Sequence, residues 1–158
     1  MTLLGPGDTF PNLSVQLVGG EKLDLPDALA GRFGVVLFNR GAWCPFCSAQ
    51  LRDFQRAHEA LDEVGASVVS LSVDDEATAQ ALVEKNGLTF PIGHSADAHA
   101  SAAETGAFIS ADPLHLQSTG FVLDPEGTVL TSVYSSGAIG RLTAEDTIGL
   151  VRYAKSHA

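Results

Sequence analysis

Cys44 and Cys47 are the only cysteines in the 158-residue chain, and their types and spacing suit thiol chemistry. They stand three positions apart, after an apolar run at 35–38 typical of a buried strand and before a pattern typical of an amphipathic helix. A thiol at a helix N-terminus lies near unpaired backbone N–H groups, which stabilise the thiolate and lower its pKa. We therefore expect Cys44 to be the nucleophile and the more exposed and more acidic thiol.

Cys47 lies one helical turn after Cys44 on the same face, so its sulfur can reach an oxidised Cys44 and close a small disulfide ring. This gives Cys44 the attacking role and Cys47 the resolving role. Two neighbours are further catalytic candidates because they are close in sequence. Arg40 would add positive charge near the thiolate, and Trp43 would shield one side of the sulfur from water.

Metal binding and a purely structural role are the competing interpretations of the pair. A zinc site needs two more ligands, and the chain offers only histidines that lack the short spacing of a ligand set. These histidines are His58, His94, His99, His115 and His157. No metal and no cofactor is therefore expected. A structural disulfide or two inert core thiols are disfavoured, because a Trp-Cys-Pro-x-Cys sequence between strand and helix is too specific a context.

Three other polar features are interpreted as structural. His58 falls on the apolar stripe of the helix that carries the cysteines, about 20 Å from Cys44 at 1.5 Å per residue, which is too far for a base. Glu104 is expected to be a surface charge. The pair Asp74-Asp75 is expected to cap the helix that follows it.

Length and composition indicate one globular domain spanning residues 1–158. A chain of this length with 45% hydrophobic and 18% charged residues can bury a core without the help of disulfides. The net charge of −10, without any basic block, excludes nucleic acid as an expected partner. No apolar run approaches the ~18 residues that span a bilayer, and the N-terminus shows no secretory signal. We therefore expect a cytoplasmic protein away from membranes, where a close cysteine pair is more often catalytic than structural.

Alternating strand and helix patterns predict an α/β fold with a central sheet flanked by helices. Alternation at 13–17, followed by Gly19-Gly20 and then Leu23 and Leu25, predicts an N-terminal hairpin at the sheet edge. The run 35–38 is the candidate for the central strand. The other expected elements are a helix from Pro45 with Cys47, Leu51, Phe54, His58 and Leu61 on one face, a strand at 68–73, a helix ending at Asn86-Gly87, a short helix at 97–105, a hairpin at 121–134 turned by 124–127, and a last helix capped by Thr143.

Five stretches together resemble the AhpC/TSA, peroxiredoxin-like branch of the thioredoxin-fold superfamily, over nearly the whole chain. They are Gly7-Asp8-x-x-Pro11, the segment 38–47, the segment 70–74, Thr89-Phe90-Pro91 and the segment 120–127. The motif Arg40-Gly41-x-Trp43-Cys44-Pro45-x-Cys47 is similar to that of a peroxiredoxin-like subgroup. The resemblance implies a thioredoxin-like fold with a central mixed β-sheet.

The resemblance also implies a thiol-dependent antioxidant oxidoreductase. Cys44 would be the peroxidatic cysteine, oxidised by hydrogen peroxide or an alkyl hydroperoxide to a sulfenic acid. The thiol would be restored through a disulfide with Cys47 and a thioredoxin-like electron donor. Assembly into a homodimer stays open.

Three positions depart from the main peroxiredoxins. Those proteins carry a Pro seven residues and a Thr or Ser three residues before the peroxidatic cysteine, and an Arg three residues before the Phe of the late strand. Here these positions are Leu37, Gly41 and Ser118. Because the Thr and the Arg polarise the peroxide, we expect a peroxidase rate below that of a typical peroxiredoxin, with Arg40 as the candidate substitute.

Two other functions stay open from sequence. Trp-Cys-x-x-Cys is also the motif of thioredoxins, so a thiol-disulfide oxidoreductase that acts on protein disulfides is the alternative. Thioredoxins also carry a cis-Pro near position 118, which this chain lacks. The third hypothesis is a non-catalytic redox sensor, in which the disulfide changes an interface.

Overall fold

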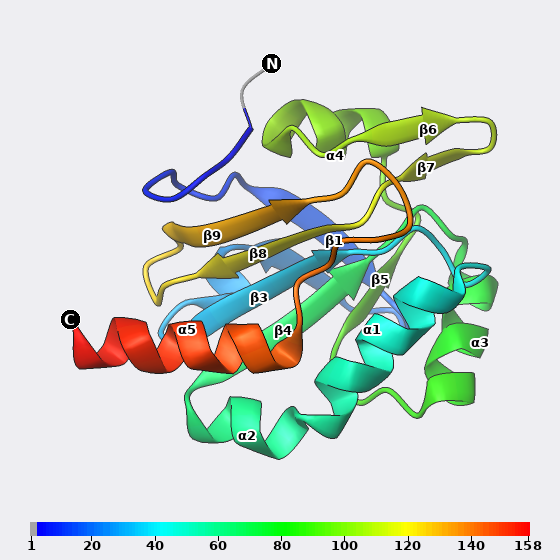
Figure 1. Ribbon diagram of the computed structural model, residues 1–158. Helices are drawn as coiled ribbons and strands as arrows, with labels where there is room; N and C mark the ends of the chain where they lie inside the picture. The colour runs from blue at the N-terminus through cyan, green and yellow to red at the C-terminus, as the bar shows by residue number, and fades with distance from the viewer. Residues whose placement is uncertain (1–2) are drawn as a thin grey trace.

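A seven-stranded mixed β-sheet forms the centre of the protein, and helices pack against it (Figure 1). This computed structural model describes residues 3–158. Met1 and Thr2, part of the stretch interpreted as lacking a secretory signal, lie outside the described residues. The strands are β1 (Leu13–Leu17), β2 (Lys22–Leu25), β3 (Phe33–Phe38), β4 (Ala66–Leu71), β5 (Ile92–His94), β8 (Thr119–Leu123) and β9 (Val129–Tyr134), with β6 (Ile109–Ala111) and β7 (Leu114–Leu116) in a separate hairpin. The helices are η1 (Asp27–Leu29), α1 (Pro45–Arg56), α2 (His58–Glu63), α3 (Glu76–Asn86), α4 (Ala98–Thr105) and α5 (Ala144–Ser156).

The strand order β2-β1-β5-β4-β3-β8-β9 places β3 well inside the sheet. β3 pairs in parallel with β4 on one side and antiparallel with β8 on the other. The run from Val35 to Phe38 is completely buried, which confirms that 35–38 is an inner strand. A continuous apolar run fits this place because layers of the protein cover both faces of the strand.

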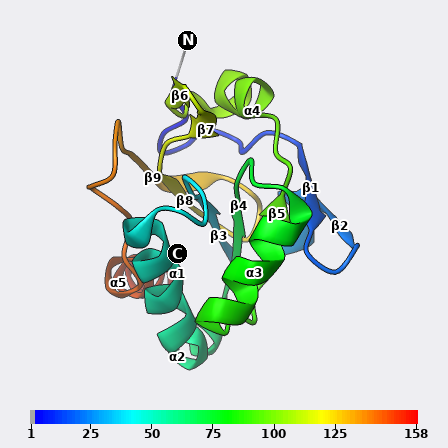
Figure 2. The same ribbon diagram turned by 90° about the vertical axis from the view of Figure 1, so that its right-hand side faces the viewer.

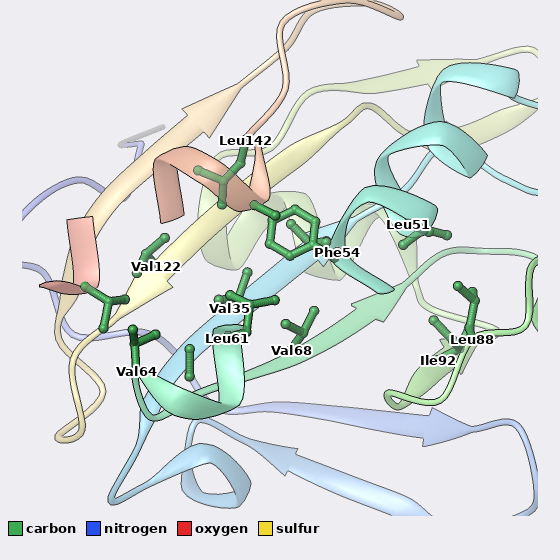
Figure 3. Close-up of a cluster of buried hydrophobic side chains, with 14 of the residues drawn as sticks. Val35, Leu51, Phe54, Leu61, Val64, Val68, Leu88, Ile92, Val122 and Leu142 are labelled. Atoms are coloured by element: carbon green, nitrogen blue, oxygen red, sulfur yellow. The ribbon is translucent and has the colours of Figure 1, made fainter. Parts of the chain in front are cut away.

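Helices α1, α2, α3 and α5 cover one face of the sheet. Leu51 and Phe54 are three residues apart on α1 and point to the same side, as helical periodicity requires. Figure 3 shows Phe54 above Val35 and Val68 of the sheet, with Leu51 farther along the helix, on the side of Leu88. This contact fixes α1 against the sheet and so fixes its first turn, which contains the cysteine pair.

The N-terminal segment, α4 and the β6-β7 hairpin cover the opposite face (Figure 2). Phe121 of β8 lies at the centre of this layer. Its ring packs edge-on against Phe10 and Phe38, with centroid distances of 5.2 and 5.7 Å. β7 leads into β8, which pairs with β3, so the β6-β7 hairpin lies close to the end of β3 where the loop toward the cysteines begins.

Several predicted elements are confirmed. β1 and β2 form the N-terminal hairpin, with Val15 opposite Leu23, and β2 is an edge strand. Asp75 caps α3 by accepting from the N–H of Thr78, and Thr143 caps α5. Within residues 3–158, no helix combines the length and the apolar character needed to cross a bilayer.

The helix predicted from Pro45 through Leu61 is wrong in one respect, because the structure divides it. α1 ends at Arg56, and α2 starts at His58 after a non-helical ψ of 7° at Ala57. The break turns Leu61 and Val64 toward β4, where both are buried. His58 is consequently exposed and does not belong to the buried stripe.

Sequence patterning missed β5, β6 and β7. Each has only three residues, too few for alternation to be distinguished from chance. The strand predicted at 68–73 is β4, shifted toward the N-terminus to Ala66–Leu71. Its last two predicted residues instead begin the loop that carries Asp74 toward the cysteine pair.

Candidate active site

The cysteine pair lies where β3 leads into α1. Cys44 is the N-cap of α1, with an extended backbone, and its sulfur accepts a hydrogen bond from the N–H of Cys47 at 3.3 Å. Pro45 occupies the first helical position, where the missing N–H costs no hydrogen bond. The structure therefore confirms that Cys44 sits at the helix N-terminus with Cys47 one turn later.

Two arginines contact the sulfurs. Arg40 reaches Cys44 Sγ with its Nη1 at 3.6 Å and donates its backbone N–H to Cys47 Sγ at 3.2 Å. Arg141, from the segment before α5, places Nη2 3.6 Å from Cys44 Sγ and 3.2 Å from Cys47 Sγ. Each sulfur thus has a guanidinium and a backbone N–H as hydrogen-bond donors.

These contacts separate the acidities of the two thiols. Burial raises the pKa of Cys44, but hydrogen bonds from the thiol and N–H of Cys47 and from Arg40, with the charge of Arg141, outweigh it and lower that pKa. Burial, followed by the hydrogen bond to Cys44, raises the pKa of Cys47 to about 11. Cys44 is the more acidic thiol, as predicted. The expectation that it is also the more exposed one is wrong: the exposed fractions are 0% for Cys44 and 1% for Cys47. The side chains of Arg40 and Arg141 lie against the sulfurs.

Titration of the reduced protein should therefore resolve two thiols. Following the ultraviolet absorbance of the thiolate, we expect one ionisation below the ordinary cysteine pKa and a second at about 11. Only the thiolate is nucleophilic, and a lowered pKa moves its formation to lower pH, so reactivity should rise with the first ionisation. The first step should vanish in Cys44→Ser. Two overlapping ionisations at the ordinary value would contradict the separation.

Trp43 packs on Arg40. The guanidinium carbon of Arg40 lies 4.8 Å from the centroid of the Trp43 ring, and the ring of His115 on β7 meets the indole edge-on at 5.1 Å. Trp43 remains 54% exposed. The contact fixes the direction of Arg40, while shielding of the Cys44 sulfur by Trp43 stays a prediction.

Comparison with known families adds to this geometry. Residues 6–132 match the family model described as the AhpC/TSA family. The chain belongs to the AhpC/TSA family. A peroxiredoxin of Methanothermobacter thermautotrophicus is 28% identical over 141 residues, which cover 85% of this chain and 66% of that protein. A peroxiredoxin of Chlorobaculum tepidum is 30% identical over 141 residues, covering 85% and 65%. The chain thus spans slightly less than two thirds of the length of these relatives.

Solved structures have the same architecture as this AhpC/TSA protein. Peroxidoxin BcpB from Mycobacterium tuberculosis superposes with a TM-score of 0.81 at 22% identity, covering 95% of this chain and 97% of that one. Mycobacterium tuberculosis AhpC gives 0.81 at 19% identity, covering 99% and 96%. At these identities the likeness concerns the fold, and it confirms the thioredoxin-like fold with its mixed central sheet.

Arg141 is the site residue that the sequence did not indicate. Ser118 stands where main-type AhpC/TSA proteins are expected to carry an arginine, and Arg141 Nη1 donates to Ser118 Oγ at 2.9 Å. A second anchor is Gln50 Oε1 at 3.1 Å. No local pattern marks Arg141, because it lies 97 positions from Cys44 and is brought there by the tertiary fold. Arg40, the candidate substitute for the arginine missing at position 118, therefore shares the Cys44 sulfur with a second arginine, Arg141.

Asp74 is a second residue whose place the sequence did not predict. Asp75, not Asp74, caps α3. Asp74 Oδ2 accepts from the N–H of Ala42 at 2.8 Å and so holds the loop between β3 and the cysteines. Gly41 in that loop has a φ of +142°, a backbone conformation that other residues adopt with strain. Glu104 is exposed, in agreement with a surface role.

Proposed function

We propose that the chain is a thiol peroxidase of the peroxiredoxin-like subgroup marked by the Arg40 to Cys47 motif. It reduces hydrogen peroxide or small alkyl hydroperoxides, with Cys44 as nucleophile and Cys47 as resolving cysteine. The observation that carries the proposal is the convergence of Arg40, Arg141 and the Cys47 N–H on the sulfur of Cys44. Donors that stabilise a thiolate also stabilise the negative charge that passes to the peroxide oxygens in the transition state.

Burial of the reduced pair favours a small oxidant over a protein disulfide. In the reduced pair Cys44 and Cys47 are 0% and 1% exposed, so a protein disulfide could meet the Cys44 sulfur only after local rearrangement. The protein that reduces the oxidised pair needs the same rearrangement, but the oxidation step by a small molecule does not. A hydroperoxide needs a far smaller opening to bring an oxygen to the Cys44 sulfur. The donors already around the Cys44 sulfur would then orient its oxygens.

Arg40 and Trp43 have supporting roles in this proposal. The Arg40 guanidinium lies 3.6 Å from Cys44 Sγ, within reach of an oxygen that approaches the sulfur. Trp43 keeps that guanidinium in place through the contact of its ring. A cation on an aromatic face loses less conformational freedom when it binds a ligand, so the pair is preorganised for an anionic oxygen.

Peroxide reduction proceeds in three steps: oxidation of Cys44, disulfide formation with Cys47 and reduction of the disulfide. The Cys44 thiolate attacks the peroxide, a sulfur–oxygen bond forms, the oxygen–oxygen bond breaks, and the departing alkoxide or hydroxide takes a proton from solvent water. The sulfur has lost two electrons and is a sulfenic acid. Cys47 attacks it, a sulfur–sulfur bond forms, and the hydroxyl leaves as water with the proton from Cys47. An external dithiol, such as a thioredoxin-like protein, then reduces the disulfide.

Catalytic turnover tests the proposal against its alternative. With thioredoxin, thioredoxin reductase and NADPH, the protein should oxidise NADPH in proportion to added hydroperoxide over many turnovers. The same preparation is assayed for reduction of insulin disulfides. Without any donor, one equivalent of peroxide should remove about two hydrogen masses and leave a monomer, since the disulfide is internal. Rapid insulin reduction without peroxide consumption would favour the thiol-disulfide oxidoreductase instead.

A further inference from the structure

Arg141 contacts both sulfurs, and it is closer to the resolving one. Its Nη2 lies 3.2 Å from Cys47 Sγ and 3.6 Å from Cys44 Sγ. The remaining guanidinium nitrogens are held by Ser118 Oγ, Gln50 Oε1 and the carbonyl of Ala138. The guanidinium is therefore anchored by a residue just before β8, by a residue of α1 and by its own segment, which fixes its position beside the two sulfurs.

We propose that Arg141 is a catalytic residue for both sulfurs in turn, first stabilising the Cys44 thiolate and then, once Cys44 is oxidised, the Cys47 thiolate that closes the disulfide. The inference rests on the proposed function for the identity of the oxidant. The attack of Cys47 on an oxidised Cys44 can be measured with other oxidants.

The charges at the reduced pair explain why Cys44 ionises first and Cys47 only after Cys44 is oxidised. The charged and titratable groups that the structure places at Cys47 are Arg40, Arg141 and Cys44. In the reduced protein, burial and then the hydrogen bond to Cys44 keep the pKa of Cys47 at about 11, so Cys47 stays a thiol and donates to its neighbour. Only one negative charge is held at the site at a time.

Oxidation of Cys44 removes that negative charge. A sulfenic acid is neutral, so the hydrogen bond and the charge that oppose ionisation of Cys47 are both lost. The N–H of Arg40 and the Nη2 of Arg141, each 3.2 Å from Cys47 Sγ in the reduced pair, then favour its thiolate. Formation of the sulfenic acid thus itself promotes ionisation of the thiol that attacks it.

Ser118 is one of the acceptors that hold Arg141 in this arrangement. Arg141 Nη1 donates to Ser118 Oγ at 2.9 Å, a bond that the arginine expected here in main-type proteins could not accept, because a guanidinium carries only donors. The small hydroxyl acts as an acceptor and turns Nη2 toward the pair. The serine thus helps to hold Arg141 where it reaches Cys47, which follows Cys44 by one turn.

Single-turnover kinetics test the inference with Arg141→Gln, Arg141→Lys and the matched control Arg152→Gln, an exposed arginine on α5. After one equivalent of hydrogen peroxide without donor, sulfenic acid is trapped with dimedone and disulfide is counted by intact mass. Arg141→Gln should slow disulfide formation by about 10- to 100-fold, the usual loss for a hydrogen bond to a charged group. Sulfenic acid formation should slow less, since Cys44 keeps Arg40 and the Cys47 N–H. Arg141→Lys should recover part of the rate, and Arg152→Gln should match the wild type.

A second measurement separates the inference from the proposed function. An aromatic disulfide reagent first forms a mixed disulfide with Cys44, and attack by Cys47 then releases a second coloured thiolate. That second release should be slowed about 10-fold or more in Arg141→Gln whether or not peroxide is a substrate. If the wild type ignores peroxide yet shows this difference, the proposed function fails and the role of Arg141 stands. If the second release and the disulfide step are unchanged in Arg141→Gln, the role is overturned.

Discussion

Replacing Cys44 by serine should abolish hydroperoxide turnover, lowering it on the order of 10³-fold or more, because a hydroxyl at the N-cap cannot supply a thiolate. The fold should survive the change. A serine is a good N-cap, and its oxygen can still accept from the N–H of residue 47, so the free energy of unfolding should change little. NADPH-coupled peroxide consumption and thermal unfolding of the same preparation measure the two effects. Residual turnover within tenfold of wild type would show that another group attacks the peroxide.

Cys47→Ser separates the two halves of the same cycle. Cys44 should still react with one equivalent of peroxide, but no internal disulfide can form, so the sulfenic acid should persist, react on to the sulfinic acid or wait for an external thiol. The expected trace is a burst of one equivalent followed by a stall. Intact mass should show added oxygen in place of lost hydrogen. Full turnover with the thioredoxin system would mean that Cys47 is not the resolving cysteine.

Local patterning was sufficient for the elements that carry the cysteines. An inner strand at 35–38, a helix N-terminus at Cys44 and a cap at Thr143 each depend on a few adjacent side chains, and all are present. The break at Ala57 was not predictable, because periodicity continues through it and only the packing of Leu61 and Val64 on the sheet decides the new axis. Three-residue strands such as β5 carry too little pattern to detect.

The site itself was predictable only where it is local. Arg40 lies four positions before Cys44 and reaches its sulfur, as expected from the sequence. Arg141 and Asp74 lie 97 and 32 positions from the atoms they contact, and a single sequence does not report such distances. The sequence shows that position 118 carries serine where an arginine is expected. Which other residue brings a second guanidinium to the sulfurs depends on where the segment before α5 passes the cysteine pair.

Gly41 is a position where restoring the family residue should do harm. Main-type peroxiredoxins are expected to carry Thr or Ser there, which suggests Gly41→Thr as a repair. In this structure φ at Gly41 is +142°, a conformation that a β-branched residue adopts only with strain. A Cβ would also collide with Trp43 Nε1 and lie 3.1 Å from Asp74 Oδ1. The Trp43 indole would have to shift, which disturbs its cation–π contact with the Arg40 guanidinium.

We therefore expect Gly41→Thr to lower the free energy of unfolding by about 1 to 3 kcal/mol and peroxide turnover by about tenfold. Denaturant unfolding and coupled peroxide consumption measure the two effects, and the fluorescence of Trp43, the only tryptophan, reports its displacement. Gly31→Ala is the matched control, since Gly31 has a φ of +87° with nothing within 4 Å of an added Cβ. It should lose stability through backbone strain alone and keep its turnover. A gain in peroxide turnover for Gly41→Thr would show that the loop accepts the family hydroxyl and that Trp43 is dispensable for placing Arg40.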